Sequence, residues 1–556
     1  MTTKLYDLKN LKGDISGGIV AGIVALPLAL AFGVQSGMGA IAGLYGAIAV
    51  GILAAAFGGT ETQASGPTGP MTVVSATFIA IAISLTGSLE NAMGIIVATF
   101  LLGGLFQIFF GIINIGSYIK YFPYPVISGF MSGVGFIIIL LQIYPFAGLS
   151  SPTSTIGVIK DISRLFSEFN IAAIGIGGLT VLIFYLFPKI TKTVPSALVA
   201  LVTVSLIAYF LKLDVLLIGD IPSGLPSLKI DGLFNIDAEA YIIILEYALI
   251  LAVLGSIDSL LTSVIADNIT KTKHNSNREL IGQGIGNAVA GLIGGIPGAG
   301  ATKGTVVNIN SGGKTRLSGV IHGLFLLVVL LGAGKLAAFI PIPVLAGILI
   351  PVGFNIVDIK GFKHLRHVPR ADAIVLVIVL LITTFGSLIY AVAIGVILAS
   401  VLFMKRSGDI AEKGTSGFTL ADLKGEQPWD DEQILFEEFK DSIYIKHLYG
   451  PLFFGFTSHF MKLFKNMDDK IKILIIRMDR VPFIDQTGLY AMEETLFDLN
   501  KKGIKVIFIG LQSQPEDMFR SIEIIPNLIP EKLLFENMDN VFLWLKKELT
   551  KDRDKQ

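Results

Sequence analysis

The sequence predicts an α-helical polytopic membrane protein with about fourteen transmembrane segments, followed by a small α/β domain. Three features predict this fold class: the overall composition, a long series of apolar runs, and a change of composition near residue 406. Of the 556 residues, 53% are hydrophobic and only 15% are charged, and the mean hydropathy is +0.72. Because soluble domains carry about 25% charged residues, we expect much of the chain to lie in the lipid bilayer.

The composition also excludes several classes of function. Basic and acidic residues number 43 each, so no net charge favours a nucleic-acid partner. The chain has no cysteine, which excludes disulfides and thiolate chemistry, and its six histidines show no metal-ligand spacing. The sequence shows neither a Ser/His/Asp arrangement nor a Walker A phosphate loop, so it favours neither an enzyme nor a pump driven by ATP.

The apolar runs lie within residues 14–406, after a polar lead at 1–13 that has no cleavable signal pattern. A membrane span needs roughly 20 apolar residues, and several runs are shorter, the tenth being half a span at most. The runs fall near 14–35, 38–58, 66–85, 92–115, 122–147, 171–188, 195–211, 239–266, 279–296, 302–313, 316–340, 342–357, 371–387 and 388–404.

The placement of basic residues supports an even number of spans with both termini in the cytoplasm. If the N-terminus is cytoplasmic and the runs alternate in direction, the cytoplasmic loops hold most of the lysines and arginines, which is the positive-inside pattern. The cytoplasmic set is Lys120, Lys189, Lys192, Lys271, Lys273, Arg278, Lys314, Arg316, Lys360, Lys363, Arg366, Arg370, Lys405 and Arg406.

Two of the runs are interrupted by stretches rich in glycine or proline. Residues 65–71 (SGPTGPM) precede the run 72–85, and residues 300–305 (GATKGT) begin the tenth run. Each break falls in the third of seven runs, which predicts two inverted repeats that meet at a central binding site. A helix that begins in mid-membrane presents its N-terminal amides, which can hold an anion. The alternative is a pair of kinked helices that serve packing alone.

Asp258 interrupts the apolar run that begins near Tyr241. An ionisable side chain at this depth is costly unless it faces a cavity, an ion or a partner, so we expect it to be functional. The alternative is a buried ion pair between Asp258 and Lys303.

The last part of the chain has the composition of a soluble protein. Residues 407–432 are polar and are predicted to form a linker, and residues 551–556 a frayed tail. Within residues 433–550, strand-like segments at 443–450, 472–479 and 505–511 alternate with helical patterns at 456–467, 487–501, 514–522 and 538–548. This alternation predicts a small α/β domain.

Several motifs in order resemble the sulfate permease (SulP) family: ALPLALAFGVQSG, GPTGPM, PYPVISGFMSG, SIDSLLTSVIADN, NRELIGQGIGN and SGGKTRLSG. The C-terminal domain resembles the STAS domain that follows the family's transporter core. The resemblance implies core and gate domains in a 7+7 inverted repeat, a homodimer, and a multi-pass location in the bacterial inner membrane. The details at the two breaks are most similar to bicarbonate transporters of the family, which implies Na⁺-coupled bicarbonate symport.

The resemblance also implies roles for individual residues. The positions that match the Na⁺ site are Asp258, Thr262, Gly300 and Thr302. The positions at or beside the anion site are Thr68, Gly69, Pro70, Met71, Ala301 and Lys303. Phe32 is a further candidate for this pocket, although an aromatic residue in a first span is more often packed or lipid-facing. Thr487 matches a position that is phosphorylated in related STAS domains, with a helix N-cap as the alternative role of Asp485 or Thr487.

The chain departs from the family at two positions that affect the expected substrate. Gly304 replaces an arginine that many members carry, and Leu28 replaces a glutamine. Without the arginine, a bound Na⁺ would supply the positive charge beside the anion. Lys303 could supply that charge instead, or could extend to water. A proton-coupled sulfate or dicarboxylate transporter and an anion exchanger therefore remain alternatives, as does a scaffold in which the STAS domain is the working part.

Overall fold

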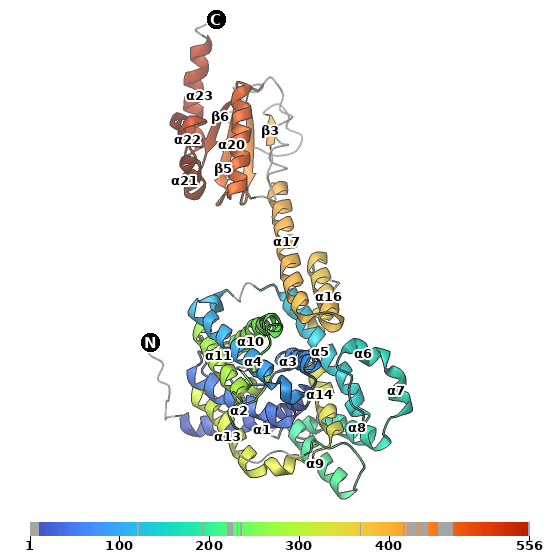
Figure 1. The fold of residues 1–556 in the computed structure, drawn as a ribbon. Helices are drawn as coiled ribbons and strands as arrows, with labels where there is room; N and C mark the ends of the chain where they lie inside the picture. Colours follow the sequence, from blue (N-terminus) through green and yellow to red (C-terminus); the bar gives the residue numbers. More distant parts are fainter. Residues whose placement is uncertain are drawn as a thin grey trace. The chain divides into compact units, whose positions relative to one another are not determined.

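The computed structural model describes residues 10–118, 122–191, 194–219, 226–230, 232–233, 236–366, 368–414, 417–419, 432, 443–453 and 471–553. The first nine residues of the predicted lead, most of the predicted linker and the helical pattern at 456–467 lie outside the described residues. The chain divides into two compact units, Met1–Ala399 and Ser400–Gln556. The first unit is a bundle of helices, and the second contains a five-stranded sheet (Figure 1).

Each of the fourteen predicted runs contains a helix. Among the described residues, eight helices are long and apolar enough to cross a membrane, and three further apolar helices are shorter. The prediction of a multi-pass membrane protein is confirmed, and the number of fourteen spans stays a prediction. The helices are α1 (Leu11–Gln35), α2 (Ala40–Phe57), α3 (Gly69–Thr86), α4 (Leu89–Ile112), α5 (Tyr124–Phe146), α8 (Ile171–Leu186), α9 (Ser196–Phe210), α10 (Ala240–Thr270), α11 (Ser276–Leu292), α12 (Thr302–Asn310), α13 (Arg316–Ala337), α14 (Ile342–Ile356), α16 (Arg370–Phe385) and α17 (Leu388–Gly414).

Short helices that the sequence analysis did not predict occupy four connections of the first unit. With three to six residues each, these helices are too short for a helical period to be recognised in the sequence, so they could not be distinguished from loops. They are η2 (Ile115–Ser117), α6 (Thr155–Lys160), α7 (Ile162–Ser167), η4 (Phe187–Lys189) and α15 (Ile359–His364).

The third and tenth runs have the predicted interruption. A two-residue strand, β1 (Ser65–Gly66), precedes α3, and a second one, β2 (Ala299–Gly300), precedes α12. With nine residues, α12 is about 14 Å long, which is half of the ~30 Å hydrocarbon core of a bilayer. Both helices therefore begin inside the unit instead of at its surface.

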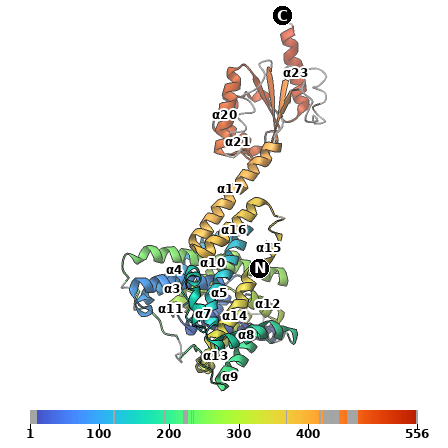
Figure 2. The same ribbon diagram turned by 90° about the vertical axis from the view of Figure 1, so that its right-hand side faces the viewer.

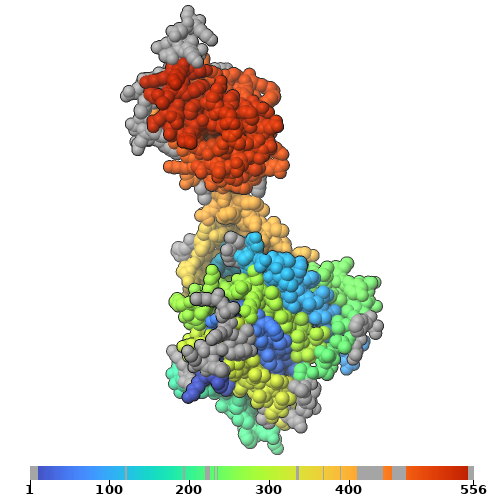
Figure 3. All heavy atoms as spheres, turned by 90° about the vertical axis from the view of Figure 1, so that its left-hand side faces the viewer, coloured from blue at the N-terminus to red at the C-terminus, as the bar shows by residue number. Residues whose placement is uncertain are grey.

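The helices of the first unit pack closely across large distances in sequence. On the face shown in Figure 3, blue atoms from the first part of the chain lie beside yellow-green atoms of α10 and α11. Gly104 of α4 and Gly284 of α11 allow a close approach, because a Cβ atom at either position would lie 2.5 Å from the carbonyl oxygen of the other. Small residues serve the same purpose at many helix contacts in membranes, where lipid offers no hydrophobic driving force.

The second unit is the predicted α/β domain. Its sheet has the order β3–β4–β5–β6–β7, with β3 antiparallel to β4 and the other neighbours parallel. Helix α20 lies on one side of this sheet (Figure 2). The core is formed by buried aliphatic side chains of β4, β5 and β6 with those of α20 and α23. The elements are β3 (Gly417–Thr419), β4 (Ile443–Tyr449), β5 (Ile473–Arg480), α20 (Gln486–Lys501), β6 (Lys505–Ile509), α21 (Ser513–Ser521), α22 (Ile524–Asn527), η6 (Glu531–Leu533), β7 (Leu534–Phe535) and α23 (Met538–Arg553).

The ends of the predicted segments differ from the structure in four places. Helix α1 already begins at Leu11, inside the predicted lead. Helix α17 continues to Gly414, and β3 then follows, so part of the predicted linker is regular structure. The polar composition of 407–419 hid both elements, because a water-exposed helix end and an edge strand need no apolar pattern. Helix α23 runs to Arg553, inside the predicted tail.

Candidate functional site

The two interruptions meet at the centre of the first unit. Strands β1 and β2 pair antiparallel, with Ser65 opposite Gly300 and Gly66 opposite Ala299. Gly298 permits this approach, because a Cβ atom there would lie 2.2 Å from the Gly66 carbonyl oxygen. The pairing satisfies backbone groups that water cannot reach at this depth. The chain segments that precede α3 and α12 are thereby held side by side.

The first half-helix, α3, begins without a side-chain cap. Thr68 occupies the N-cap position, where a hydroxyl usually accepts a hydrogen bond from an amide of the first turn. The Thr68 hydroxyl instead donates to Oδ2 of Asp258 over 2.7 Å. Pro70 has no amide hydrogen and fits the first turn, while the amides of Gly69 and Met71 are left without an intrahelical acceptor.

The second half-helix, α12, begins in the same way. Its N-cap residue is Ala301, whose side chain cannot accept a hydrogen bond. The Ala301 amide donates to the Ala64 carbonyl over 2.8 Å, which ties α12 to the segment before β1. The amides of Thr302, Lys303 and Gly304 form the open first turn. Two uncapped helix N-termini therefore begin directly after one pair of strands, which is an arrangement suited to an anion.

Three of the four residues matched to a Na⁺ site are in hydrogen-bond contact, and the fourth, Asp258, lies one helical turn from Thr262. On α10, Asp258 and Thr262 lie four residues apart on one helical face. The Thr262 hydroxyl donates to the Gly300 carbonyl over 2.9 Å and lies 2.8 Å from the Thr302 hydroxyl oxygen. A carboxylate, two hydroxyls and a carbonyl form a donor set of hard oxygen atoms, which suits a hard cation.

The alternative explanation for Asp258 does not fit the structure. Asp258 is buried, with 8% of its surface exposed, and Lys303 is exposed. Within the described parts of the chain, Lys303 forms no ion pair with Asp258 or any other acidic side chain. The Asp258 carboxylate is thus hydrogen-bonded to the Thr68 hydroxyl and is not paired with Lys303.

The remaining predicted anion-site residues lie around the first break. Gly69 faces α14 and α5, since a Cβ atom there would lie 2.6 Å from Ile356 Cδ1 and 2.9 Å from Ile138 Cδ1. Met71 is buried, and its sulfur would be 3.4 Å from a Cβ atom on Gly255 of α10. Phe32 of α1 is also buried, so it does not face lipid.

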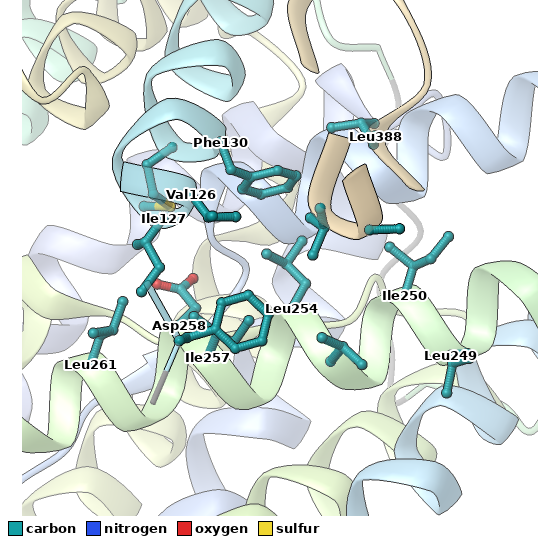
Figure 4. A pocket seen from close by; sticks show the side chains of 15 residues that line it. Val126, Ile127, Phe130, Leu249, Ile250, Leu254, Ile257, Asp258, Leu261 and Leu388 are labelled. Atoms are coloured by element: carbon teal, nitrogen blue, oxygen red, sulfur yellow. The ribbon is translucent and has the colours of Figure 1, made fainter. Parts of the chain in front are cut away.

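A cavity of about 220 Å³ lies beside Asp258. It is enclosed by α5, α10 and α17, and Asp258 is the one ionisable side chain among its fifteen lining residues. Figure 4 shows the Asp258 carboxylate on the α10 wall among apolar side chains such as Ile127 and Leu254. The carboxylate therefore faces an internal space and not the lipid, as predicted for a functional intramembrane acid.

Glu279, which the sequence analysis did not identify, anchors the segment before the first break. Its side chain is buried, with 1% of the residue exposed. Oε2 accepts the amides of Gly59 and Thr60 over 2.8 and 2.9 Å, and Oε1 accepts Nε2 of Gln63 and of Gln283 over 2.8 and 2.9 Å. All four partners are donors, so both oxygens of the Glu279 side chain serve as acceptors.

Through further contacts, the residues bound to Glu279 connect it to both breaks and to α10. Gln283 also donates to the Ser65 hydroxyl over 2.7 Å, and Gln63 accepts the Ser263 hydroxyl over 2.9 Å. Gln63 lies directly against Gly300, where a Cβ atom would be 2.3 Å from its Nε2. The sequence did contain a signal for Glu279, because this residue begins an apolar run. An ionisable side chain in such a run is costly unless it is paired, and this argument, which identified Asp258, applies to Glu279 as well.

A further buried acid, Asp14, holds the connection between α12 and α13. Asp14 of α1 accepts the amides of Lys314 and Thr315 over 2.8 and 3.1 Å, and the Thr315 hydroxyl over 2.6 Å. It lies just after the predicted lead, where an acid is usually solvated, so the sequence analysis assigned it no role. The connection that follows the short helix α12 is therefore fixed by α1.

The STAS candidate Thr487 is exposed in the first turn of α20. Asp485 is the N-cap of this helix, and its Oδ1 accepts the Gly488 amide over 2.7 Å. The capping role left open by the sequence thus belongs to Asp485. Phosphorylation of Thr487 stays a prediction.

Two glycines of the second break provide a matched test of this geometry. Gly300→Ala is expected to destabilise the site, because the new Cβ atom would lie 2.3 Å from Gln63 Nε2. Gly304→Ala is expected to be tolerated, because its nearest neighbours would be 3.5 and 3.6 Å away. We expect Gly300→Ala to lower the transport rate about fivefold or more, for an overpacking cost of ~1–3 kcal/mol. Equal rates in the two variants would contradict the described approach of Gln63 to β2.

The chain matches known proteins over nearly its whole length. A model described as the sulfate permease family matches residues 11–379, and a STAS domain model matches residues 437–540. The chain is 39% identical over 545 residues to the bicarbonate transporter BicA of Picosynechococcus sp., covering 96% of this chain and 94% of that protein. It is 31% identical over 547 residues to the putative sulfate transporter YvdB of Bacillus subtilis, covering 97% of this chain and 98% of that protein.

Solved structures agree with the fold described above. The transmembrane domain of a cyanobacterium bicarbonate transporter BicA is 44% identical, with a TM-score of 0.64, and covers 71% of this chain and 98% of that chain. Murine Slc26a9, an anion transporter solved in the inward-facing state, is 19% identical, with a TM-score of 0.85 over 98% of this chain and 92% of that chain. The latter likeness concerns the fold alone.

Proposed function

Since the chain belongs to the sulfate permease family and is a multi-pass membrane transporter and not an enzyme, we propose that it is a secondary transporter that couples Na⁺ to bicarbonate uptake. The substrate is the one printed in the names of relatives that are 39% and 40% identical over nearly the whole chain. A gradient of Na⁺ supplies the energy.

The observation that carries this proposal is the pair of uncapped helix N-termini that follow β1 and β2. Bicarbonate binds between α3 and α12, where it accepts hydrogen bonds from the amides of Gly69 and Met71 and of the first turn of α12. A small planar monoanion needs few donors and little volume. Each helix end adds a partial positive charge of roughly half a unit, which is effective where water is excluded.

The cation binds beside the anion. The Asp258 carboxylate, the hydroxyls of Thr262 and Thr302 and the Gly300 carbonyl supply its ligands. Thr68, which donates to Asp258, also begins α3, so the cation ligands and the anion ligands share backbone. Binding of either ion favours the other by the same factor, because coupling between two sites is reciprocal.

We further propose the arrangement of the protein in the cell. The two groups of seven runs are inverted repeats, with the interrupted helix third in each group. Both termini lie in the cytoplasm of a bacterium, and the transporter lies in the inner membrane. It functions as a homodimer, to which the C-terminal α/β unit contributes.

The direct test is uptake of labelled bicarbonate by proteoliposomes at fixed pH, with inward gradients of either Na⁺ or K⁺. We expect at least about tenfold faster initial uptake with Na⁺, a lower bicarbonate KM at higher Na⁺, and little competition from sulfate, succinate or chloride. Full uptake with K⁺ alone would contradict the coupling, and strong competition by sulfate would contradict the substrate.

Lys303 distinguishes this proposal from the alternative of a sulfate or dicarboxylate transporter or anion exchanger. The lysine has no acidic partner among the described residues, so its charge is available in the first turn of α12. If Na⁺ supplies the charge, Lys303→Gln should change the bicarbonate KM by less than about threefold. A loss of about tenfold or more that is independent of Na⁺ would assign the charge to Lys303, since ~1.4 kcal/mol corresponds to a factor of ten.

A further inference from the structure

A second, larger cavity lies away from the ion site, between α9 and the helices α1, α2 and α13. Its volume is about 490 Å³. Its lining is apolar except for Ser205 and Tyr209, and comprises Leu26, Leu30, Leu44, Leu198, Leu201, Val202, Ser205, Leu206, Tyr209, Val329, Ala337, Phe339 and Ile340.

One face of α9 forms a whole wall of this cavity. Leu198, Leu201, Ser205 and Tyr209 recur at helical spacing and so lie on one side of the helix. Towards the rim, Val202 and Leu206 line the cavity and are each 49% exposed. The cavity is therefore open to the outer surface of the transmembrane unit, which is the surface that contacts lipid.

Because this cavity is open along one side, we call it the groove. Hydrogen bonds between backbone groups close one end of the groove, and aromatic side chains lie just inside that end. The Ile218 amide donates to the Ile340 carbonyl over 3.0 Å, and the Ile342 amide donates to the Leu216 carbonyl over 2.8 Å. Just inside this end, the rings of Tyr209 and Phe339 meet edge to face with centroids 5.6 Å apart. Tyrosines concentrate at the boundary between hydrocarbon and headgroups, so this end of the groove lies at a membrane interface.

Filling the groove with water, or leaving it empty, would be unfavourable in free energy. A bound water needs two to four polar partners, and the lining offers two polar side chains. An empty space of this size would forfeit contacts along its whole lining. An apolar lining and an opening towards lipid suit a hydrocarbon chain, which needs no polar partners.

We propose that this groove binds one acyl chain of a bilayer phospholipid, with the headgroup at the end formed by Tyr209 and Phe339. The Ser205 hydroxyl lies in the wall and has no hydrogen-bond partner within the described residues. The site is independent of which anion the protein carries.

The test uses the full chain in nanodiscs with a phospholipid that carries a photoactivatable diazirine midway along one acyl chain. After irradiation, we expect labelled peptides from α9 and from the facing part of α1. Ser205→Phe, which fills the groove, is expected to lower this labelling at least fivefold. Thr203→Phe is the matched control, because Thr203 is exposed on another face of the same helix.

A second blocking variant, Val329→Phe, fills the groove from the opposite wall on α13. It gives the same test if Ser205→Phe does not yield a monodisperse protein, and we expect the same loss of labelling. Labelling that stays within twofold of the wild type in a folded blocking variant would overturn the proposal. Labelling spread evenly over exposed helix faces, which indicates annular lipid only, would overturn it as well.

Discussion

Replacing Asp258 by asparagine is expected to abolish Na⁺-dependent bicarbonate uptake, lowering kcat/KM at least about 100-fold. Asparagine keeps an oxygen that can accept the Thr68 hydroxyl, which now lies 2.7 Å from Asp258 Oδ2, so the start of α3 stays in place. It removes the negative charge from the proposed cation site. Loss of one partner from a buried charge pair costs ~3–5 kcal/mol, and ~1.4 kcal/mol corresponds to a factor of ten.

The measurement is the initial rate of labelled uptake in proteoliposomes across a series of Na⁺ concentrations. Glu246→Gln is the matched control, because this acid lies earlier on the same helix and does not line the cavity beside Asp258. We expect it to transport within twofold of the wild type. Uptake by Asp258→Asn that keeps its Na⁺ dependence would show that the cation binds elsewhere.

Replacing Glu279 by glutamine is expected to have the second-largest effect, although Glu279 contacts neither ion in the proposed mechanism. Its carboxylate accepts four hydrogen bonds from neutral donors. An amide would turn a donor towards other donors, and each buried group left unpaired costs ~1–3 kcal/mol. Because Gln63 and Ser65 belong to the segment that pairs with β2, we expect the KM values for both ions to rise about tenfold or more.

The readout separates a positioning role from a general loss of structure. In Glu279→Gln, kcat should fall less than KM rises, and the reconstituted protein should stay monodisperse. The control is Glu90→Gln, an exposed acid in the first turn of α4. Unchanged KM values in a stable Glu279→Gln protein would mean that the segment before β1 is held without this carboxylate.

The sequence predicted the parts of this molecule that follow local rules. Irregular backbone in an apolar chain must be paired or line a cavity, and the two breaks at 65–71 and 300–305 are indeed paired through β1 and β2. The same reasoning placed Asp258 beside an internal space. The strands of the second unit followed from β-branched runs bounded by turns or charges.

The parts that sequence reasoning missed depend on contacts between distant segments. Glu279 and Gln63 are far apart in the chain, and nothing in either local pattern indicates that they pair. The antiparallel strand β3 pairs at an edge through its backbone, which needs no apolar signature. The four oxygen ligands of the proposed cation site were grouped by family resemblance, and only the fold brings the Thr262 hydroxyl to the Gly300 carbonyl.

The central claim is that one cation and one anion occupy adjacent sites and cross the membrane together. The most direct measurement is accumulation of radioactive ²²Na⁺ in proteoliposomes that have no Na⁺ gradient but an inward bicarbonate gradient. We predict Na⁺ accumulation against its own gradient in the wild type and none in Asp258→Asn. Bicarbonate uptake without any movement of ²²Na⁺ would contradict the account.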